Sequence, residues 1–277
     1  MPTTVSSRKY LILAICCLSL FISSMDVTIV NVALPSIRTD FGVAVSQLQW
    51  TVDAYTLSLA GFLLLSGSLA DRFGRKRVFL IGLTVFGIGS LLCSIAPSIG
   101  FLIAARALQG IGGSMLNPVA LSIISNTFTV ARERARAIGV WGAVVGISVA
   151  VGPVLGGLLT ETVGWRSVFW VNLPVVAIAL VFCSIFVPES RAAIARRLDP
   201  IGQGLVIIAL LALVFGLIEG PRLGWGSPLS IGLFVLAALA IVVLLRQERR
   251  IDERRRQFLD ADFEEQREAF GHGGAKD

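Results

Sequence analysis

Long runs of apolar residues, separated by short polar segments, repeat along the sequence up to about residue 245. Each run is close to the ~20 residues that an α-helix needs to cross the hydrocarbon core of a bilayer. Because lipid offers the backbone no hydrogen-bond partner, such a run must form a helix. We predict eight membrane spans, at residues 10–34, 49–70, 78–96, 99–128, 135–159, 168–187, 201–218 and 229–245. The pattern thus predicts an all-α integral membrane protein.

The amino-acid composition excludes most other classes of protein. Of the 277 residues, 55% are hydrophobic and 15% are charged, whereas soluble domains carry about 25% charged residues. The cysteines all lie within apolar runs, which favours packing over disulfide or metal chemistry; they are Cys16, Cys17, Cys93 and Cys183. The sequence shows no metal-ligand spacing, no nucleophile–base pair and no phosphate-binding loop, so we expect no metal, no cofactor and no enzyme activity.

Positive charge is distributed unevenly between the connecting segments. Successive segments fall alternately on the two sides of the membrane. Of the 24 Lys and Arg residues, 20 lie in the segments of one side, which include the C-terminal tail, and only three lie in the segments of the other side. Because positively charged loops are retained in the cytoplasm, we predict a multi-pass protein of the cell (plasma or inner) membrane with both termini cytoplasmic. A basic excess spread over short loops does not form the clustered basic face of a nucleic-acid-binding protein, so we expect no such partner.

The same pattern divides the chain into three parts. Residues 1–190 hold six spans, and residues 191–245 hold two more. Residues 246–277 form a charged tail with a loose apolar stripe at helical spacing. Two interpretations of this cytoplasmic tail stand side by side: a solvated charged helix, or a helix that lies on a partner or on the membrane surface.

The segment between the second and third spans, residues 67–77, reads GSLADRFGRKR. Gly67 and Gly74 allow close backbone approach and a tight turn. We expect the Asp71 carboxylate to accept hydrogen bonds from backbone N–H groups at a neighbouring helix N-terminus. The cationic side chains of this segment hold it in the cytoplasm and are placed to pair with Asp71; they are Arg72, Arg75, Lys76 and Arg77.

The fourth and fifth spans contain further distinctive segments. Residues 102–113 read LIAARALQGIGG and place Arg106 and Gln109 inside the fourth span. Residues 142–158 read GAVVGISVAVGPVLGGL. Small residues there let helices pack closely, and Pro153 bends the span. The glycines of this second segment that we single out are Gly146, Gly152, Gly156 and Gly157.

These three segments resemble the loop signature, the fourth-span signature and the fifth-span antiporter signature of the major facilitator superfamily. Residues 26–35 (DVTIVNVALP), 164–174 (GWRSVFWVNLP) and 198–202 (LDPIG) resemble marks of its 14-span drug:proton antiporter branch, the EmrB/QacA type. The resemblance covers about residues 10–245. It implies a six-helix N-terminal bundle with two additional spans, and it implies proton-coupled secondary transport, with multidrug or other small-molecule efflux as the leading function.

The branch places a second six-helix bundle after the two additional spans, and this sequence stops before it. We therefore expect a truncated half of a transporter, whose partners are a small-molecule substrate, protons, the lipid bilayer and either a second bundle or a second copy of the chain. An inactive or regulatory half-transporter is one alternative. A transporter of another solute is a second.

Two charged residues lie deep inside predicted spans, where a charge costs about 2.5–3.5 kcal/mol on insertion scales. From the helical rise per residue, Asp26 lies roughly 12 Å and Arg106 roughly 10 Å below the outer surface. In the family these two spans are counterparts in an inverted repeat and line the central cavity, so a pair between the two residues is geometrically allowed. The alternative is a separate polar partner for each. We expect Asp26 to be the proton-sensitive carboxylate and Arg106 its electrostatic regulator, with Asn31 and Gln109 in the same cavity.

Overall fold

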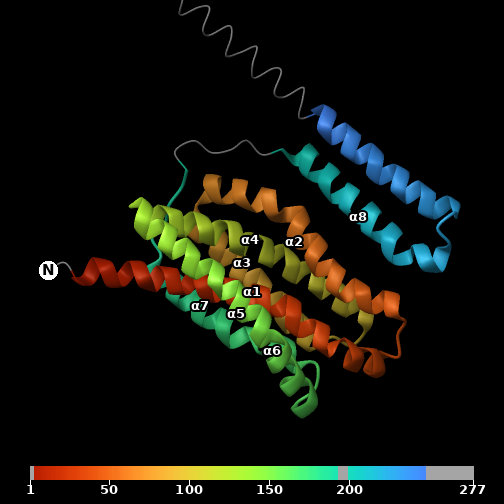
Figure 1. The fold of residues 1–277 in the computed structure, drawn as a ribbon, viewed down its shortest axis with the longest axis horizontal. Helices are drawn as coiled ribbons and strands as arrows, with labels where there is room; N and C mark the ends of the chain where they lie inside the picture. Colours follow the sequence, from red (N-terminus) through yellow and green to blue (C-terminus); the bar gives the residue numbers. More distant parts are fainter. Residues whose placement is uncertain (1–2, 193–198, 248–277) are drawn as a thin grey trace, which may run out of the picture. The chain divides into compact units, whose positions relative to one another are not determined.

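The structure, a computed structural model, describes residues 3–192 and 199–247 (Figure 1). Within these residues, eight helices are long and apolar enough to cross a membrane, so the predicted all-α membrane fold is confirmed. The chain divides into two compact units, residues 1–199 and 200–277. The boundary predicted from the sequence, after residue 190, lies nine residues before this division. Nearly all of the predicted tail at 246–277 lies outside the described residues.

In the described part of the first unit, seven helices follow one another (Figure 1). They are α1 (Thr3–Phe41), α2 (Val45–Phe73), α3 (Arg75–Ser94), α4 (Ile99–Thr127), α5 (Ala131–Thr162), α6 (Ser167–Trp170) and α7 (Asn172–Phe186). Helix α4 packs along α2 and α3, α1 packs along α5, and α7 packs against α1 and α3. The short α6 and α7 together form the sixth predicted span, and Val171 is the turn residue between them.

Several helices continue beyond the spans that hydropathy predicts. Helix α1 runs on through Pro35, and α5 begins at Ala131. Arg132 and Arg134, predicted to lie in a loop, therefore lie in the first turns of α5, where the acidic Glu133 suits the positive end of the helix dipole. Hydropathy detects only the lipid-immersed part of a helix, whereas the backbone hydrogen bonds that extend a helix do not require apolar side chains.

Two clusters of buried apolar side chains fill the core of the first unit. One includes Phe86 of α3 and Leu116 of α4, and the other includes Cys93 of α3 and Leu102 of α4. On both helices, a short stretch that contains polar residues separates the members of one cluster from the members of the other. The core is therefore apolar toward each end of the bundle and polar in a layer between them.

The second unit, as far as it is described, is a hairpin of α8 (Pro200–Leu223) and a last helix that covers Pro228–Gln247. Gly224 lies in the turn between them with a φ of 87°, a conformation that residues with a Cβ rarely adopt. Glu219 of α8 is buried and accepts a hydrogen bond of 2.8 Å from Nε of Arg222. The carboxylate thus has a charged partner one turn away on its own helix.

Candidate functional site

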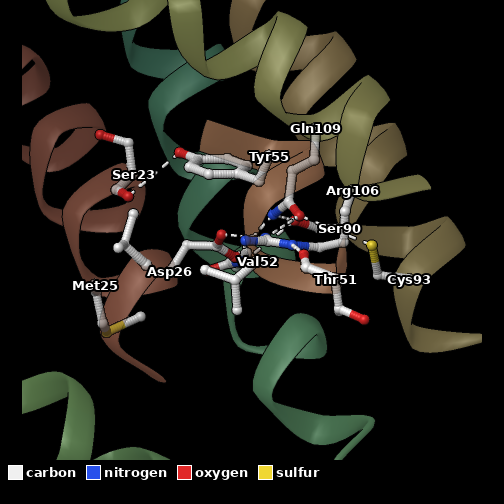
Figure 2. Close-up of polar contacts among 12 residues, drawn as sticks. Ser23, Met25, Asp26, Thr51, Val52, Tyr55, Ser90, Cys93, Arg106 and Gln109 are labelled. Atoms are coloured by element: carbon white, nitrogen blue, oxygen red, sulfur yellow. Dashed lines mark hydrogen bonds and ion pairs between the residues drawn. The ribbon is translucent and has the colours of Figure 1, made fainter. Parts of the chain in front are cut away.

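A layer of polar side chains crosses the first unit between its two apolar clusters, and Figure 2 shows its contacts around Asp26 and Arg106. Asp26 comes from α1, Ser90 from α3, Arg106 and Gln109 from α4, and Asn172 from the first turn of α7. All five residues are 0% exposed. The layer forms because four helices each place one or two polar residues at the same depth in otherwise apolar faces.

Arg106 uses two of its nitrogens to bind three groups. Nη1 donates to Oδ2 of Asp26, with which it forms a buried ion pair, and to Oε1 of Gln109 at 2.7 Å. Nε donates to the backbone oxygen of Thr51 in α2 at 3.0 Å. The pair that the sequence allowed between Asp26 and Arg106 is therefore present, and it connects α1 with α4 and, through Thr51, with α2.

The other carboxylate oxygen of Asp26, Oδ1, accepts two further hydrogen bonds. Nε2 of Gln109 donates to it at 2.8 Å and Nδ2 of Asn172 donates to it at 2.9 Å. Both amides also donate to Oγ of Ser90, at 2.8 Å from Gln109 and 3.2 Å from Asn172. Every one of these partners of the carboxylate is a donor, so the layer is complementary to a negative charge on Asp26.

Two aromatic rings flank the guanidinium of Arg106. Its Cζ lies 4.3 Å from the centre of the Tyr55 ring and 5.9 Å from the centre of the Phe169 ring. At these distances a cation is attracted to the π face of a ring. The Tyr55 hydroxyl in turn donates to the backbone oxygen of Ser23 in α1 at 3.4 Å (Figure 2). One carboxylate and two rings thus balance the buried cation in place of water.

The stability of the buried ion pair depends on both of its charges. Removal of one partner leaves an uncompensated buried charge, which costs about 3–5 kcal/mol. A proton on the carboxylate removes the negative charge without removing any atom. The ion pair therefore places a carboxylate, whose charge a proton can remove, beside a cation that keeps its charge.

Of the four residues predicted for the coupling site, three meet in the polar layer and one does not. Asp26, Arg106 and Gln109 contact one another. Asn31 lies on an exposed face of α1 and donates to the backbone oxygen of Val27 at 3.1 Å. Five residues at 3.6 residues per turn rotate Asn31 well away from Asp26, so the two side chains point in different directions.

Asn172 and Ser90 are members of the layer that the sequence prediction missed. Asn172 interrupts the apolar sixth span in the segment WVNLP. A polar amide in such a run is a signal that could have identified it, because polar residues inside a membrane are expensive. Ser90 offered no comparable signal, since serine hydroxyls in helices commonly bond to the preceding turn.

The predicted loop motif between α2 and α3 has a partner that the sequence did not indicate. Oε1 of Glu189, which follows α7, accepts a hydrogen bond of 3.1 Å from the backbone N–H of Lys76, and Oε2 lies 3.7 Å from Nε of Arg77. The carboxylate at the N-terminus of α3 is thus Glu189 and not Asp71, which corrects the prediction. Asp71 lies in the last turn of α2, where carbonyls rather than N–H groups are free, and it pairs with Arg75 at 3.3 Å.

The two glycines of this motif differ in their surroundings. Gly74 has a φ of 113°, and a Cβ there would lie 2.6 Å from Cδ of Glu189. The tight turn and the close approach are therefore both found at Gly74. No atom of the described residues lies within 4 Å of a Cβ built on Gly67, so the expected close approach is not found there. Nζ of Lys76 donates to a backbone oxygen of α7 at 2.6 Å, whereas Arg72 is exposed.

The predicted fifth-span motif contacts α1 through two of its residues. A Cβ on Gly152 would overlap a threonine side chain of α1, and a Cβ on Gly156 would lie 3.0 Å from the α1 backbone. At Gly146 and Gly157 no atom of the part of the chain that the structure describes lies within 4 Å of the Cβ position, and Pro153 is exposed. The close approach of α5 to α1 therefore depends on glycines at i and i+4, which share one helix face.

A second polar cluster ties together the end of the bundle at which α1 finishes. Oδ2 of Asp40 accepts hydrogen bonds from Nε1 of Trp165 at 3.0 Å and from Nη1 of Arg166 at 2.9 Å. Nη2 of Arg166 donates to the backbone oxygen of Ala96 at 3.1 Å, and its guanidinium lies 4.2 Å from the centre of the Trp165 ring. The Trp–Arg pair of GWRSVFWVNLP thus joins α1, the end of α3 and the α5–α6 connection.

Comparison with characterised proteins places these features in a family. Multidrug resistance protein Stp of Mycobacterium tuberculosis (strain CDC 1551 / Oshkosh) is 45% identical over 233 residues, which are 84% of this chain and 43% of that protein. Puromycin resistance protein pur8 of Streptomyces alboniger is 44% identical over 229 residues, 83% of this chain and 45% of that protein. Tetracenomycin C resistance and export protein of Streptomyces glaucescens is 37% identical over 231 residues, 83% of this chain and 43% of that protein. The chain spans about half the length of the curated relatives it matches.

The fold has counterparts among solved structures. The POT family transporter PepTSo superposes with a TM-score of 0.57 at 15% identity, over 90% of this chain and 55% of that one. At this identity the likeness concerns the fold alone. The sequence model of the Major Facilitator Superfamily matches residues 16–247, which include all the residues of the polar layer. The chain is a multi-pass membrane protein that belongs to the Major Facilitator Superfamily.

Proposed function

We propose that this chain forms one bundle of a proton-coupled exporter of small amphipathic or cationic compounds. The buried pair of Asp26 and Arg106 carries the proposal, because ionisable residues inside a membrane mark ion and substrate pathways. The names of the relatives, which describe resistance or export, support efflux as the direction of transport. The family is one of transporters, and we propose no enzymatic step.

The polar layer offers the two electrostatic states that coupling requires. An ionised Asp26 neutralises Arg106 and holds α1 to α4. A proton bound by Asp26 weakens that attraction and leaves the Arg106 cation with the rings of Tyr55 and Phe169. Protonation therefore favours a rearrangement of α1 against α4, and release of the proton on the other side of the membrane completes the exchange.

An exporter of this kind needs a second wall opposite the bundle, because alternating access moves one bundle against another. We propose that a second six-helix bundle, or a second copy of the chain, supplies that wall. Within the described structure, only 11% of the most apolar stretch of α5 is buried, against 61% of the corresponding stretch of α1. Helix α5 therefore has apolar surface available for a partner or for lipid.

The uneven distribution of basic residues supports a cell-membrane location with both termini in the cytoplasm.

Reconstitution in liposomes with an imposed pH gradient tests the proposal. The flux of a fluorescent quaternary ammonium compound is measured for the purified chain, alone and combined with the second half of a relative such as the puromycin resistance protein. We expect saturable flux that depends on the gradient and that Asp26→Asn abolishes. Glu161→Gln is the matched control, because Glu161 is an exposed carboxylate near the end of α5, and its flux should be unchanged.

Each outcome of this experiment points to one interpretation. Undiminished proton-driven flux from Asp26→Asn would reject Asp26 as the proton carrier. No flux in either preparation would favour an inactive or regulatory half-transporter. Flux from chains that single-molecule counting shows to be monomeric would contradict the need for a second wall, whereas flux from a pair of chains would support it.

A further inference from the structure

The two amides that donate to Asp26 differ in what their own oxygens contact. Oε1 of Gln109 accepts from Nη1 of Arg106 at 2.7 Å and from Sγ of Cys93 at 3.8 Å. Oδ1 of Asn172 is buried and has no hydrogen-bond partner within the described part of the chain. Nearly all buried acceptors in proteins are paired. An unpaired oxygen on a side chain that binds an ionisable carboxylate therefore calls for an explanation.

The two amides also differ in what half a turn of the side-chain amide would do. Half a turn of the Gln109 amide would aim its NH₂ group at Nη1 of Arg106, so that two donors would face each other. For Asn172, the same turn brings an unpaired oxygen to the position beside Asp26 that Nδ2 now occupies. Because an amide carries a donor and an acceptor at equivalent positions, Asn172 can accept a hydrogen bond where it now donates one.

We propose that Asn172 is a switch amide, which donates to Asp26 when the carboxylate is ionised and accepts from it when the carboxyl is protonated. A hydronium ion gives its proton to Oδ1 of Asp26 and leaves a water molecule, and the N–H···Oδ1 bond from Asn172 breaks. The amide turns about its Cβ–Cγ bond, and its oxygen accepts the new O–H bond. Ser90, whose hydroxyl accepts from Asn172 in this structure, then donates to the same amide oxygen. The inference rests on the proposed function, in which Asp26 carries the coupled proton, and Asn172 is a positioning residue in it.

The other ionisable groups near Asp26 do not accept a hydrogen bond from its protonated carboxyl group. Arg106 has donors only. The Tyr55 hydroxyl of α2 donates to the α1 backbone, and Cys93 of α3 donates to Gln109. The ionisable residues of α5 lie in its end turns, and the only one in α7, Cys183, lies in the apolar cluster that includes Phe86. Asn172 therefore supplies the acceptor that a protonated Asp26 requires.

Infrared difference spectroscopy on the purified full chain tests the switch without any need for transport. Protonation of Asp26 gives a carboxyl C=O band that Asp26→Asn removes. With isotope-labelled asparagine, we expect a side-chain amide band to change along the same pH titration and to be lost in Asn172→Leu.

Asn117→Leu is the matched control. Asn117 of α4 accepts from Oγ of Ser23 at 3.4 Å, a contact outside the carboxylate's own hydrogen bonds, and its replacement should leave the pH-dependent amide band in place. If Asn172→Leu does not fold, the labelled amide band of the unmodified chain still decides the question. An Asp26 band that titrates with no change in any asparagine amide band would overturn the switch and leave the proposed function standing. Absence of a titrating Asp26 band would overturn both.

Discussion

The guanidinium of Arg106 and the carboxylate of Asp26 meet inside the first unit, although 80 positions separate them along the chain. Neither side chain is more than 1% exposed. The cost of removing both charges from water offsets much of their mutual attraction, so the pair adds little net stability. Its consequence is a strong mutual dependence, since each charge requires the other.

That dependence predicts a non-additive pair of substitutions. Asp26→Leu and Arg106→Met should each lower the free energy of unfolding by about 3–5 kcal/mol, because each leaves one buried charge without its partner. The double variant should lose less than the sum of the two by about 3 kcal/mol or more, since no charge remains buried. Denaturant unfolding of the purified chain in mixed micelles measures the three values. Strictly additive losses would show that the two charges do not interact.

The contact between α1 and α5 predicts opposite effects for two glycines of one helix. Gly152→Ala places a methyl group against α1 and should lower the free energy of unfolding by about 1–3 kcal/mol. Gly157→Ala adds the same group where none of the described atoms lies within 4 Å, so the better helix propensity of alanine should raise the free energy of unfolding by up to about 1 kcal/mol. The same unfolding assay compares them. Equal effects would contradict the described packing.

The carboxylate of Glu189 should protect the N-terminus of α3 from exchange. Glu189→Ala removes the acceptor of the Lys76 backbone N–H, and loss of a helix cap costs about 1 kcal/mol. Hydrogen exchange at the Lys76 amide should therefore become about fivefold faster. Glu133→Ala, which removes a surface carboxylate paired with Lys9, is the control and should leave this amide unchanged. An unaltered exchange rate in Glu189→Ala would show that the contact contributes nothing.

The predicted topology places the two ends of α4 on opposite sides of the membrane. Ser98 precedes this helix and Thr129 follows it, and both residues are exposed. In a cysteine-free background, Ser98→Cys should react with a membrane-impermeant thiol reagent in intact cells. Thr129→Cys should react only after permeabilisation, because the segments rich in Lys and Arg stay in the cytoplasm. The reverse pattern would invert the assigned orientation.

Hydropathy alone located the membrane helices of this protein, because a chain in lipid must satisfy its backbone hydrogen bonds within apolar helices of a set length. The family motifs located Asp26, Arg106 and Gln109, since charged and amide groups are conspicuous in an apolar sequence. The glycine of the α2–α3 turn, Gly74, was also identified from the sequence, because local backbone geometry by itself requires it.

Only the tertiary structure decided which polar groups meet. Asn172 rather than Asn31 binds Asp26, and Glu189 rather than Asp71 binds the N-terminus of α3. These choices depend on the rotation of each helix about its own axis and on contacts between residues far apart in sequence. A membrane helix that is apolar on all sides carries no amphipathic pattern to show which face is turned inward, so the pairing of faces arises only when the helices pack.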